Sequence, residues 1–210
     1  MIDQYGWSDA LGQDFAPHAA QGRVAGRVAV QHRGLYTVAT DFGELSAQLS
    51  GYLMREAEEG GYPAVGDWVA LVPRPEEGKA TIHAVLPRRT AFLRKAADSV
   101  QTTQVVAANV DVAFLVASMN ADFNLRRLER YLATAWQSGA RPVVVLTKAD
   151  LCDAPDDIVA AAESVAFGTP VLAVSACLRA VSVALRTADG RRAVAKESAD
   201  PVDEHSHARR

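Results

Sequence analysis

Residues 143–150 read Val143-Val144-Val145-Leu146-Thr147-Lys148-Ala149-Asp150, and they indicate the fold class more strongly than any other part of the chain. A short β-branched run that ends in small or polar residues is typical of a buried parallel strand that delivers a loop to a ligand crevice. A second run of this kind, one helix length later, reads Pro170-Val171-Leu172-Ala173-Val174-Ser175-Ala176. The two runs predict parallel strands that each end in a ligand-binding loop.

The polar residues at these strand ends suit the recognition of guanine. The carboxylate of Asp150 can accept two hydrogen bonds from the N1–H and exocyclic amine of guanine, which adenine cannot offer. Lys148 can lay its aliphatic stem across the base plane, and backbone N–H groups around Ser175 and Ala176 can meet the guanine O6. The alternative is that Lys148 and Asp150 are solvated loop residues. The pattern indicates which base is bound and nothing about hydrolysis.

The sequence around these runs alternates between strand and helix patterns. An apolar strand pattern covers residues 110–116, and a helix is predicted over 124–138, with leucines at helical spacing and Gly139 as its stop. A second helix is predicted over 155–166. This alternation predicts an α/β domain with a parallel sheet and right-handed crossovers.

A different pattern precedes Leu86. Short strand-like runs, separated by turns rich in Gly and Pro, cover residues 22–30, 35–40, 44–49, 67–72 and 80–86. Five such runs predict an all-β N-terminal domain, a small five-stranded barrel of the oligonucleotide-binding (OB) type. Gly66-Asp67-Trp68 opens the fourth run, and we expect Trp68 to be a core residue rather than a stacking platform for a base.

Composition narrows the class of protein. The chain has 210 residues, of which 49% are hydrophobic, so it can hold one large domain or two small ones. A net charge of −3 gives no global nucleic-acid signature, so any RNA contact must come from a local patch. Cys152 and Cys177 have no metal-ligand spacing, so no metal site is predicted. With no secretory signal and no apolar stretch near the ~20 residues of a membrane span, we expect a cytoplasmic protein without a membrane partner.

Basic residues in and after the predicted barrel are the candidates for RNA contact. The predicted set comprises Arg23, Arg27, Arg33, Arg88, Arg89, Arg94 and Lys95. Basic and aromatic residues on one barrel face suit single-stranded or loop RNA. The alternative is a solvated face, because several glutamates in the same segment offset the charge.

Four segments carry a resemblance to a known family. They are Gly66-Asp67-Trp68, Gln104-Val105-Val106-Ala107-Ala108-Asn109-Val110-Asp111, Phe123-Asn124 followed by Arg126-Arg127-Leu128-Glu129-Arg130-Tyr131-Leu132, and Thr147-Lys148-Ala149-Asp150-Leu151. In this order they resemble the ribosome small-subunit-dependent GTPase A family. The resemblance implies an OB barrel, a circularly permuted P-loop GTPase domain and a small zinc-binding domain. Permutation places the guanine-specificity motifs ahead of the P-loop.

The resemblance also implies function. Members bind GTP or GDP with Mg²⁺, bind the small ribosomal subunit and its rRNA, and hydrolyse GTP late in subunit maturation; we expect a monomer. The guanine contacts then fall to Thr147, Lys148, Asp150, Ser175 and Ala176. Thr147 stands where the family has Asn, and a hydroxyl replaces only part of the hydrogen bonding of that amide.

The family pattern stops after Ala176. The nearest approach to a P-loop, residues 190–197, has Ala195 for a glycine and Glu197 for the hydroxyl that binds Mg²⁺. We therefore identify no catalytic residue and no zinc ligands, and we leave enzyme activity undecided. A truncated or frame-shifted product is the hypothesis that fits this break.

The predicted order of parts is an N-terminal arm (1–21), the barrel (22–87), a basic linker (88–103), a partial GTPase domain (104–185) and a disordered tail (186–210). Three functions remain open. They are guanine-nucleotide and rRNA binding in small-subunit biogenesis with impaired catalysis, RNA or ribosome binding without hydrolysis, and a non-functional remnant.

Overall fold

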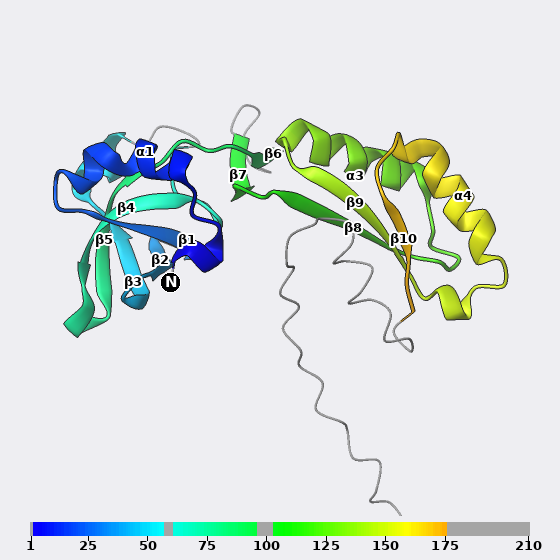
Figure 1. Cartoon of the computed structure of the whole chain (residues 1–210), viewed down its shortest axis with the longest axis horizontal. Helices are drawn as coiled ribbons and strands as arrows, with labels where there is room; N and C mark the ends of the chain where they lie inside the picture. The colour runs from blue at the N-terminus through cyan, green and yellow to red at the C-terminus, as the bar shows by residue number, and fades with distance from the viewer. Residues whose placement is uncertain (1, 57–60, 96–102, 176–210) are drawn as a thin grey trace, which may run out of the picture. The chain divides into compact units, whose positions relative to one another are not determined.

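The computed structural model describes residues 2–56, 61–95 and 103–175 (Figure 1). The chain divides into two compact units, Met1–Leu115 with Leu125–Val143, and Val116–Asn124 with Val144–Arg210. The P-loop-like residues 190–197, the tail and Ala176 lie outside the described residues. No helix in the described ranges is long and apolar enough to cross a membrane.

A closed five-stranded barrel forms the first part of the chain. Its strands are β1 (Val24–His32), β2 (Leu35–Thr40), β3 (Gly43–Leu49), β4 (Trp68–Arg74) and β5 (Lys79–Val85). They close in the order β1-β2-β3-β5-β4, with β3 and β5 parallel and the other pairs antiparallel. The predicted OB-type barrel is confirmed.

Alternation along the strands builds the barrel core. In β3, Leu45, Ala47 and Leu49 are buried while the residues between them are exposed, as the two-residue period of a strand requires. Residues from all five strands join this core: Val28, Tyr36, Val38, Leu45, Ala47, Leu49, Val69, Leu71, Ala80 and Ile82. A short helix, α2 (Gly51–Glu56), follows β3.

The N-terminal arm folds onto the outside of the barrel. It contains η1 (Ile2–Tyr5) and α1 (Asp9–Ala19), which begins after the N-cap Ser8. Leu11 of α1 packs with Trp68, and the Trp7 ring meets the Trp68 ring edge-on at 4.9 Å between centroids. Trp68 is 1% exposed, so its prediction as a core residue is confirmed.

A tight junction joins the start of β4 to the chain that follows the barrel. Gly66 has φ +89°, and a Cβ there would lie 2.1 Å from the Ala108 carbonyl oxygen. The Ala108 N–H donates to the Val65 carbonyl at 2.8 Å. Only glycine combines this conformation with so close an approach, which gives the Gly66-Asp67-Trp68 motif a structural role.

The segment expected as a linker contains a strand. Strand β6 (Ala91–Lys95) pairs antiparallel with β7 (Thr103–Ala108). The apolar residues Ala91, Phe92 and Leu93 lie between basic ones, and it is this short apolar run that the hairpin uses.

A three-stranded sheet follows, with β8 (Val112–Ser118), β9 (Arg141–Thr147) and β10 (Val171–Ala173) in the order β10-β9-β8. Helices α3 (Leu125–Ser138) and α4 (Pro155–Ala166) lie between these strands in sequence (Figure 1). Leu128, Leu132 and Ala135 form the buried stripe of α3. The predicted α/β alternation is confirmed.

Candidate functional site

The two polar strand ends predicted as a guanine site lie next to each other. Strands β9 and β10 are parallel, with Leu146 opposite Ala173 in register. The Val174 N–H donates to the Leu146 carbonyl at 2.8 Å, and the Ala149 N–H donates to the Val174 carbonyl at 3.3 Å. These bonds join the Thr-Lys-Ala-Asp loop to the Val-Ser segment, although 24 positions separate Lys148 from Leu172 in the chain.

The backbone turns sharply at Lys148. This residue has φ 62° and ψ 35°, in the left-handed region that non-glycine residues rarely adopt. It leads into a single 3₁₀ turn, η3 (Ala149–Leu151), closed by a 3.1 Å bond from the Leu151 N–H to the Lys148 carbonyl. Lys148 and Asp150 are both exposed, so both side chains are accessible to a ligand at this edge.

Ser175 lies at the end of the second loop and is 5% exposed. Its predicted contact with the guanine O6 stays a prediction. Ala176, its predicted companion, lies outside the described residues.

Thr147 has a structural partner. Its hydroxyl donates to the Ala117 carbonyl at 3.4 Å, and its own carbonyl accepts the Met119 N–H at 2.9 Å. These bonds fix the end of β9 to the end of β8 and to the residue after it. The structure therefore places Thr147 in support of the loop.

The turn after β8 also lies among these strand ends and was not predicted. The Asn120 side-chain oxygen accepts the Ser118 hydroxyl at 3.0 Å and the Asp122 N–H at 3.2 Å. The signal in the sequence that could have predicted this turn is Asn120 itself, because Asn side chains in turns commonly accept a hydrogen bond from the backbone two residues later.

Two of the predicted RNA-binding arginines bind other parts of the chain. Arg27 donates from Nη2 to the Asn109 carbonyl at 2.9 Å, from Nε to the Gly66 carbonyl at 3.3 Å, and from Nη1 to the Tyr5 carbonyl. Its guanidinium lies 5.5 Å from the Trp68 ring centroid, a cation–π distance. Burial lowers the pKa of Arg27.

Arg88 pairs with a fully buried carboxylate. Its Nη2 lies 2.7 Å and its Nε 2.9 Å from the two oxygens of Asp67, which is 0% exposed. Nη2 also donates to the Tyr62 carbonyl. Burying a carboxylate requires such a partner, so Arg27 and Arg88 stabilise the junction, and an RNA contact by either stays a prediction.

Asn109 completes this junction, and sequence reasoning missed it as a contact residue. It is 2% exposed with φ 54°; its side chain accepts the Arg89 N–H at 3.0 Å and donates to the Gly66 carbonyl at 3.2 Å. The two family-like segments that contain Gly66 and Asn109 thus meet in space. No local pattern reports such a contact.

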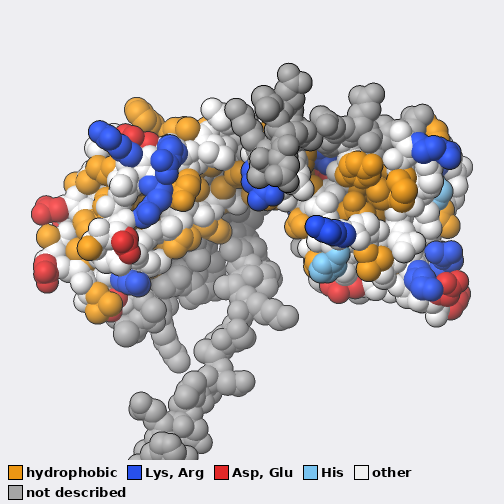
Figure 2. All heavy atoms as spheres, turned by 180° about the vertical axis from the view of Figure 1, so that it is seen from behind, with side chains coloured by type: hydrophobic (Ala, Val, Ile, Leu, Met, Phe, Trp, Pro, Cys, Tyr) orange, Lys and Arg blue, Asp and Glu red, His pale blue; other side chains and the backbone are white. Residues whose placement is uncertain are grey.

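The other predicted basic residues are dispersed. Arg23 lies 3.1 Å from His18, Arg89 lies 4.0 Å from Asp111, and Arg94 donates to Gln104. Arg33 is exposed in the turn between β1 and β2, and Lys95 ends β6. On the face drawn in Figure 2, Lys and Arg side chains form separate groups rather than one patch.

Metal ligands do not gather within the described ranges, where no group of three or more His, Cys, Asp or Glu side chains could hold an ion. By the resemblance, the P-loop and the zinc ligands follow Ala176, a part of the chain that lies outside the described residues.

Comparison with known proteins gives a consistent result. Residues 85–188 match the family model described as RsgA GTPase. The chain is 42% identical over 182 residues to the small ribosomal subunit biogenesis GTPase RsgA of Syntrophotalea carbinolica, which covers 83% of this chain and 50% of that protein. The protein of the same name from Streptomyces coelicolor is 41% identical over 180 residues, covering 83% and 48%. The chain spans about half the length of these curated relatives.

Two solved structures share the fold of this chain. YjeQ from Thermotoga maritima superposes with a TM-score of 0.56 at 26% identity, covering 73% of this chain and 52% of that one. YloQ, described as a circularly permuted GTPase, gives 0.57 at 23% identity with the same coverage and supports the fold. The resemblance read from the motifs is confirmed.

Proposed function

We propose, on the premise of this similarity to the RsgA GTPase family, that the chain binds guanine nucleotide at the carboxyl ends of β9 and β10. The observation that carries the proposal is the backbone contact between Ala149 and Val174, which holds the two loops together. The carboxyl ends of parallel strands are the usual ligand-binding edge of such sheets.

Each residue has a role in this proposal. The Asp150 carboxylate accepts the guanine N1–H and exocyclic amine, and the stem of Lys148 covers the base plane. The backbone near Ser175 and Ala176 donates to O6. Thr147 orients the loop through its bond to Ala117.

The proposal is limited to base recognition. Family members hold the phosphates and Mg²⁺ with a P-loop, and the sequence of the described residues contains no G-x-x-x-x-G-K-[ST] pattern. No hydrolytic step is therefore assigned. Since phosphates contribute much of nucleotide affinity, we expect GDP and GTP to bind this chain weakly, and a submicromolar Kd by calorimetry would contradict that expectation.

Base selectivity tests the proposal. Asp150→Asn replaces an acceptor by an amide that can donate to the 2-oxo group of xanthine, so preference should shift from GDP towards XDP. Competition against a fluorescent guanine nucleotide measures the shift, which we expect to reach about tenfold. Asp153→Asn, an exposed neighbour that loses the same charge, is the matched control. Equal affinity of the native chain for GDP and ADP would overturn the proposal.

The second part of the proposed function is contact with the small ribosomal subunit and its rRNA, in the cytoplasm and as a monomer, during late subunit maturation. The OB-type barrel and the names of the relatives support it. Filter binding to purified small subunits tests it, and absence of saturable binding would remove both this contact and the alternative of a non-hydrolysing RNA-binding module.

A further inference from the structure

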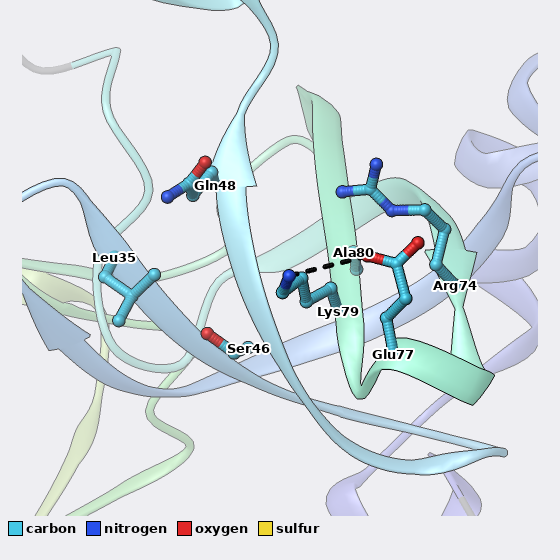
Figure 3. A pocket seen from close by; sticks show the side chains of 7 residues that line it. All are labelled: Leu35, Ser46, Gln48, Arg74, Glu77, Lys79 and Ala80. Carbon is cyan, nitrogen blue, oxygen red and sulfur yellow. Dashed lines mark ion pairs between the residues drawn. The ribbon is translucent and has the colours of Figure 1, made fainter.

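A polar groove of about 330 Å³ lies on the barrel, away from the junction. Figure 3 shows the side chains that line it, which come from β2, β3, β5, the end of β4 and the turn between β4 and β5. They are Leu35, Ser46, Gln48, Arg74, Glu77, Lys79 and Ala80. Its volume is near the lower end of the range for small-molecule sites, about 300–1,000 Å³.

Strand register brings these residues together. Ser46 and Gln48 alternate with the buried core residues of β3, so they lie on its outer face. Lys79 stands opposite Ser46 on one side and opposite Arg74 on the other. Two cations are thus held on adjacent strands, although like charges in this position repel.

Glu77 offsets part of that repulsion. Its carboxylate lies 3.5 Å from the Lys79 ammonium, and both side chains are more than half exposed. An exposed ion pair of this kind contributes little, about 0–1 kcal/mol. Lys79 can therefore exchange this partner for a ligand anion at small cost.

The chemistry of the groove matches a nucleotide. Arg74 and Lys79 can bind a phosphate, with the planar guanidinium suited to two of its oxygens. Gln48 and Glu77 offer a donor and acceptors to a base edge, and Leu35 offers an apolar contact. The Glu77 carboxylate would repel a ligand that carries only negative charge, whereas it can accept a hydrogen bond from the N–H of a base.

The place of the groove in the fold favours the same ligand. It is lined by the start of β2, by β3 and by β5, and it includes the turn between β4 and β5. Five-stranded OB barrels bind oligonucleotides with the outer face of their second and third strands and with the loops between strands 1–2 and 4–5.

We propose that this groove binds one unpaired nucleotide of a single-stranded RNA segment, with Arg74 and Lys79 on the backbone phosphate and with Gln48 and Glu77 toward the base. The inference rests on the proposed RNA contact and specifies where it occurs. It places the contact at residues outside the basic set that the sequence predicts.

The double variant Arg74→Gln/Lys79→Gln tests the groove in the full chain. Fluorescence anisotropy with a labelled, unstructured oligouridylate should show at least about tenfold weaker binding. The slope of log K against log salt should fall by roughly 0.7 for each phosphate that the variant no longer neutralises. The matched control, Arg126→Gln/Arg130→Gln, removes the same charge from exposed positions of α3 and should change binding less than about twofold.

A third variant keeps the test decisive if the double variant folds poorly. Gln48→Ala removes one proposed base contact and leaves both cations and Glu77, so oligouridylate should bind about two- to threefold more weakly. Circular dichroism checks that each variant keeps the native fold.

The outcomes separate the two proposals. If the native chain binds neither oligouridylate nor small subunits, both the proposed RNA contact and the groove are overturned. If RNA binds and the two double variants lose affinity equally, the groove alone is overturned. An oligoglutamate peptide that binds the groove more tightly than oligouridylate would overturn it in favour of an acidic protein partner.

Discussion

The barrel and the three-stranded sheet bury their residues in different ways. Each barrel strand has two strand neighbours, and ten buried side chains form its closed core. In the sheet, burial concentrates in the central strand β9, where residues 142–146 are all buried. The outer strands β8 and β10 each have one strand neighbour within the described part of the chain, and Phe114 and Val116 of β8 are 48% and 61% exposed.

Apolar strands of similar sequence can therefore differ in how many neighbouring strands pair with them and in how much of their surface is buried. A barrel has no free edge, because its first and last strands pair with others. An open sheet depends on whatever covers its faces and edges. We therefore expect the barrel to set the most stable part of the molecule and the sheet to open more readily.

The largest effect is expected at the barrel junction. Asp67→Ala leaves Arg88 without its buried carboxylate partner and removes the acceptor of the Ala64 N–H. Breaking a buried ion pair in this way costs about 3–5 kcal/mol, measurable as the free energy of unfolding in urea. Glu77→Gln breaks an exposed pair and is the control, with an expected loss below about 0.5 kcal/mol. Equal losses in the two variants would show that the junction does not support the barrel.

The next effect compares the two cores directly. Leu71 in the barrel and Leu146 in the sheet are both 0% exposed, and Leu→Ala at such sites costs about 2–5 kcal/mol. In Leu71→Ala we expect faster amide hydrogen exchange throughout β1 to β5. In Leu146→Ala we expect faster exchange in β9 and β10 with barrel amides unchanged, since sub-global openings follow cooperative units.

Hydrogen exchange read by mass spectrometry decides this comparison. If Leu146→Ala accelerates exchange in the barrel as much as in the sheet, the two regions unfold as one unit. The expected hierarchy of stability would then be wrong.

The smallest effect concerns pH and belongs to the barrel unit. Burial, and then the positive charge of Arg23, lower the pKa of His18 and of His83. As the pH falls below the ordinary histidine pKa of about 6.5, the unfolded chain therefore binds more protons than the folded chain does. The free energy of unfolding is then highest above this pH and decreases on acidification. Between pH 7.5 and 5.5 we expect the Tm of the barrel to fall by about 1–3 °C.

Arg23→Gln sharpens this test. This substitution removes the positive charge that lowers the pKa of His18 and of His83, while the two histidines stay buried to the same extent. The fall in Tm on acidification should therefore become smaller. The described residues of the second unit, 116–124 and 144–175, contain no histidine. A Tm that rises on acidification would contradict the assignment.

Much of the fold was predictable because its signals are local. The alternation around Leu45, Ala47 and Leu49, the leucine spacing of α3 and the β-branched run before Thr147 each identify an element from its neighbours in sequence. The strand β6 was missed because its short apolar run is surrounded by basic residues, which resemble a linker.

The candidate site was predictable in part. Lys148 and Asp150 were predicted from the chemistry of guanine recognition, and their guanine contacts remain a prediction. The partner of Thr147 could not be predicted, because Ala117 lies 30 positions away and the bond uses a backbone carbonyl. Arg27 and Arg88 were predicted to contact RNA from their charge, and that contact stays a prediction. Their bonds to Asn109 and Asp67 could not be predicted, because these partners lie far away in the sequence.

The sequence by itself determined the order of elements, the two loops that suit guanine and the resemblance to one family, since these depend on residue type and spacing. The tertiary structure decided which distant groups meet: Gly66 against Ala108, Arg27 on Asn109, Arg88 on Asp67, and Arg74 beside Lys79. The physical reason is that a backbone carbonyl or a buried carboxylate bonds to whichever donor lies next to it in the folded chain. A local sequence pattern does not contain this proximity.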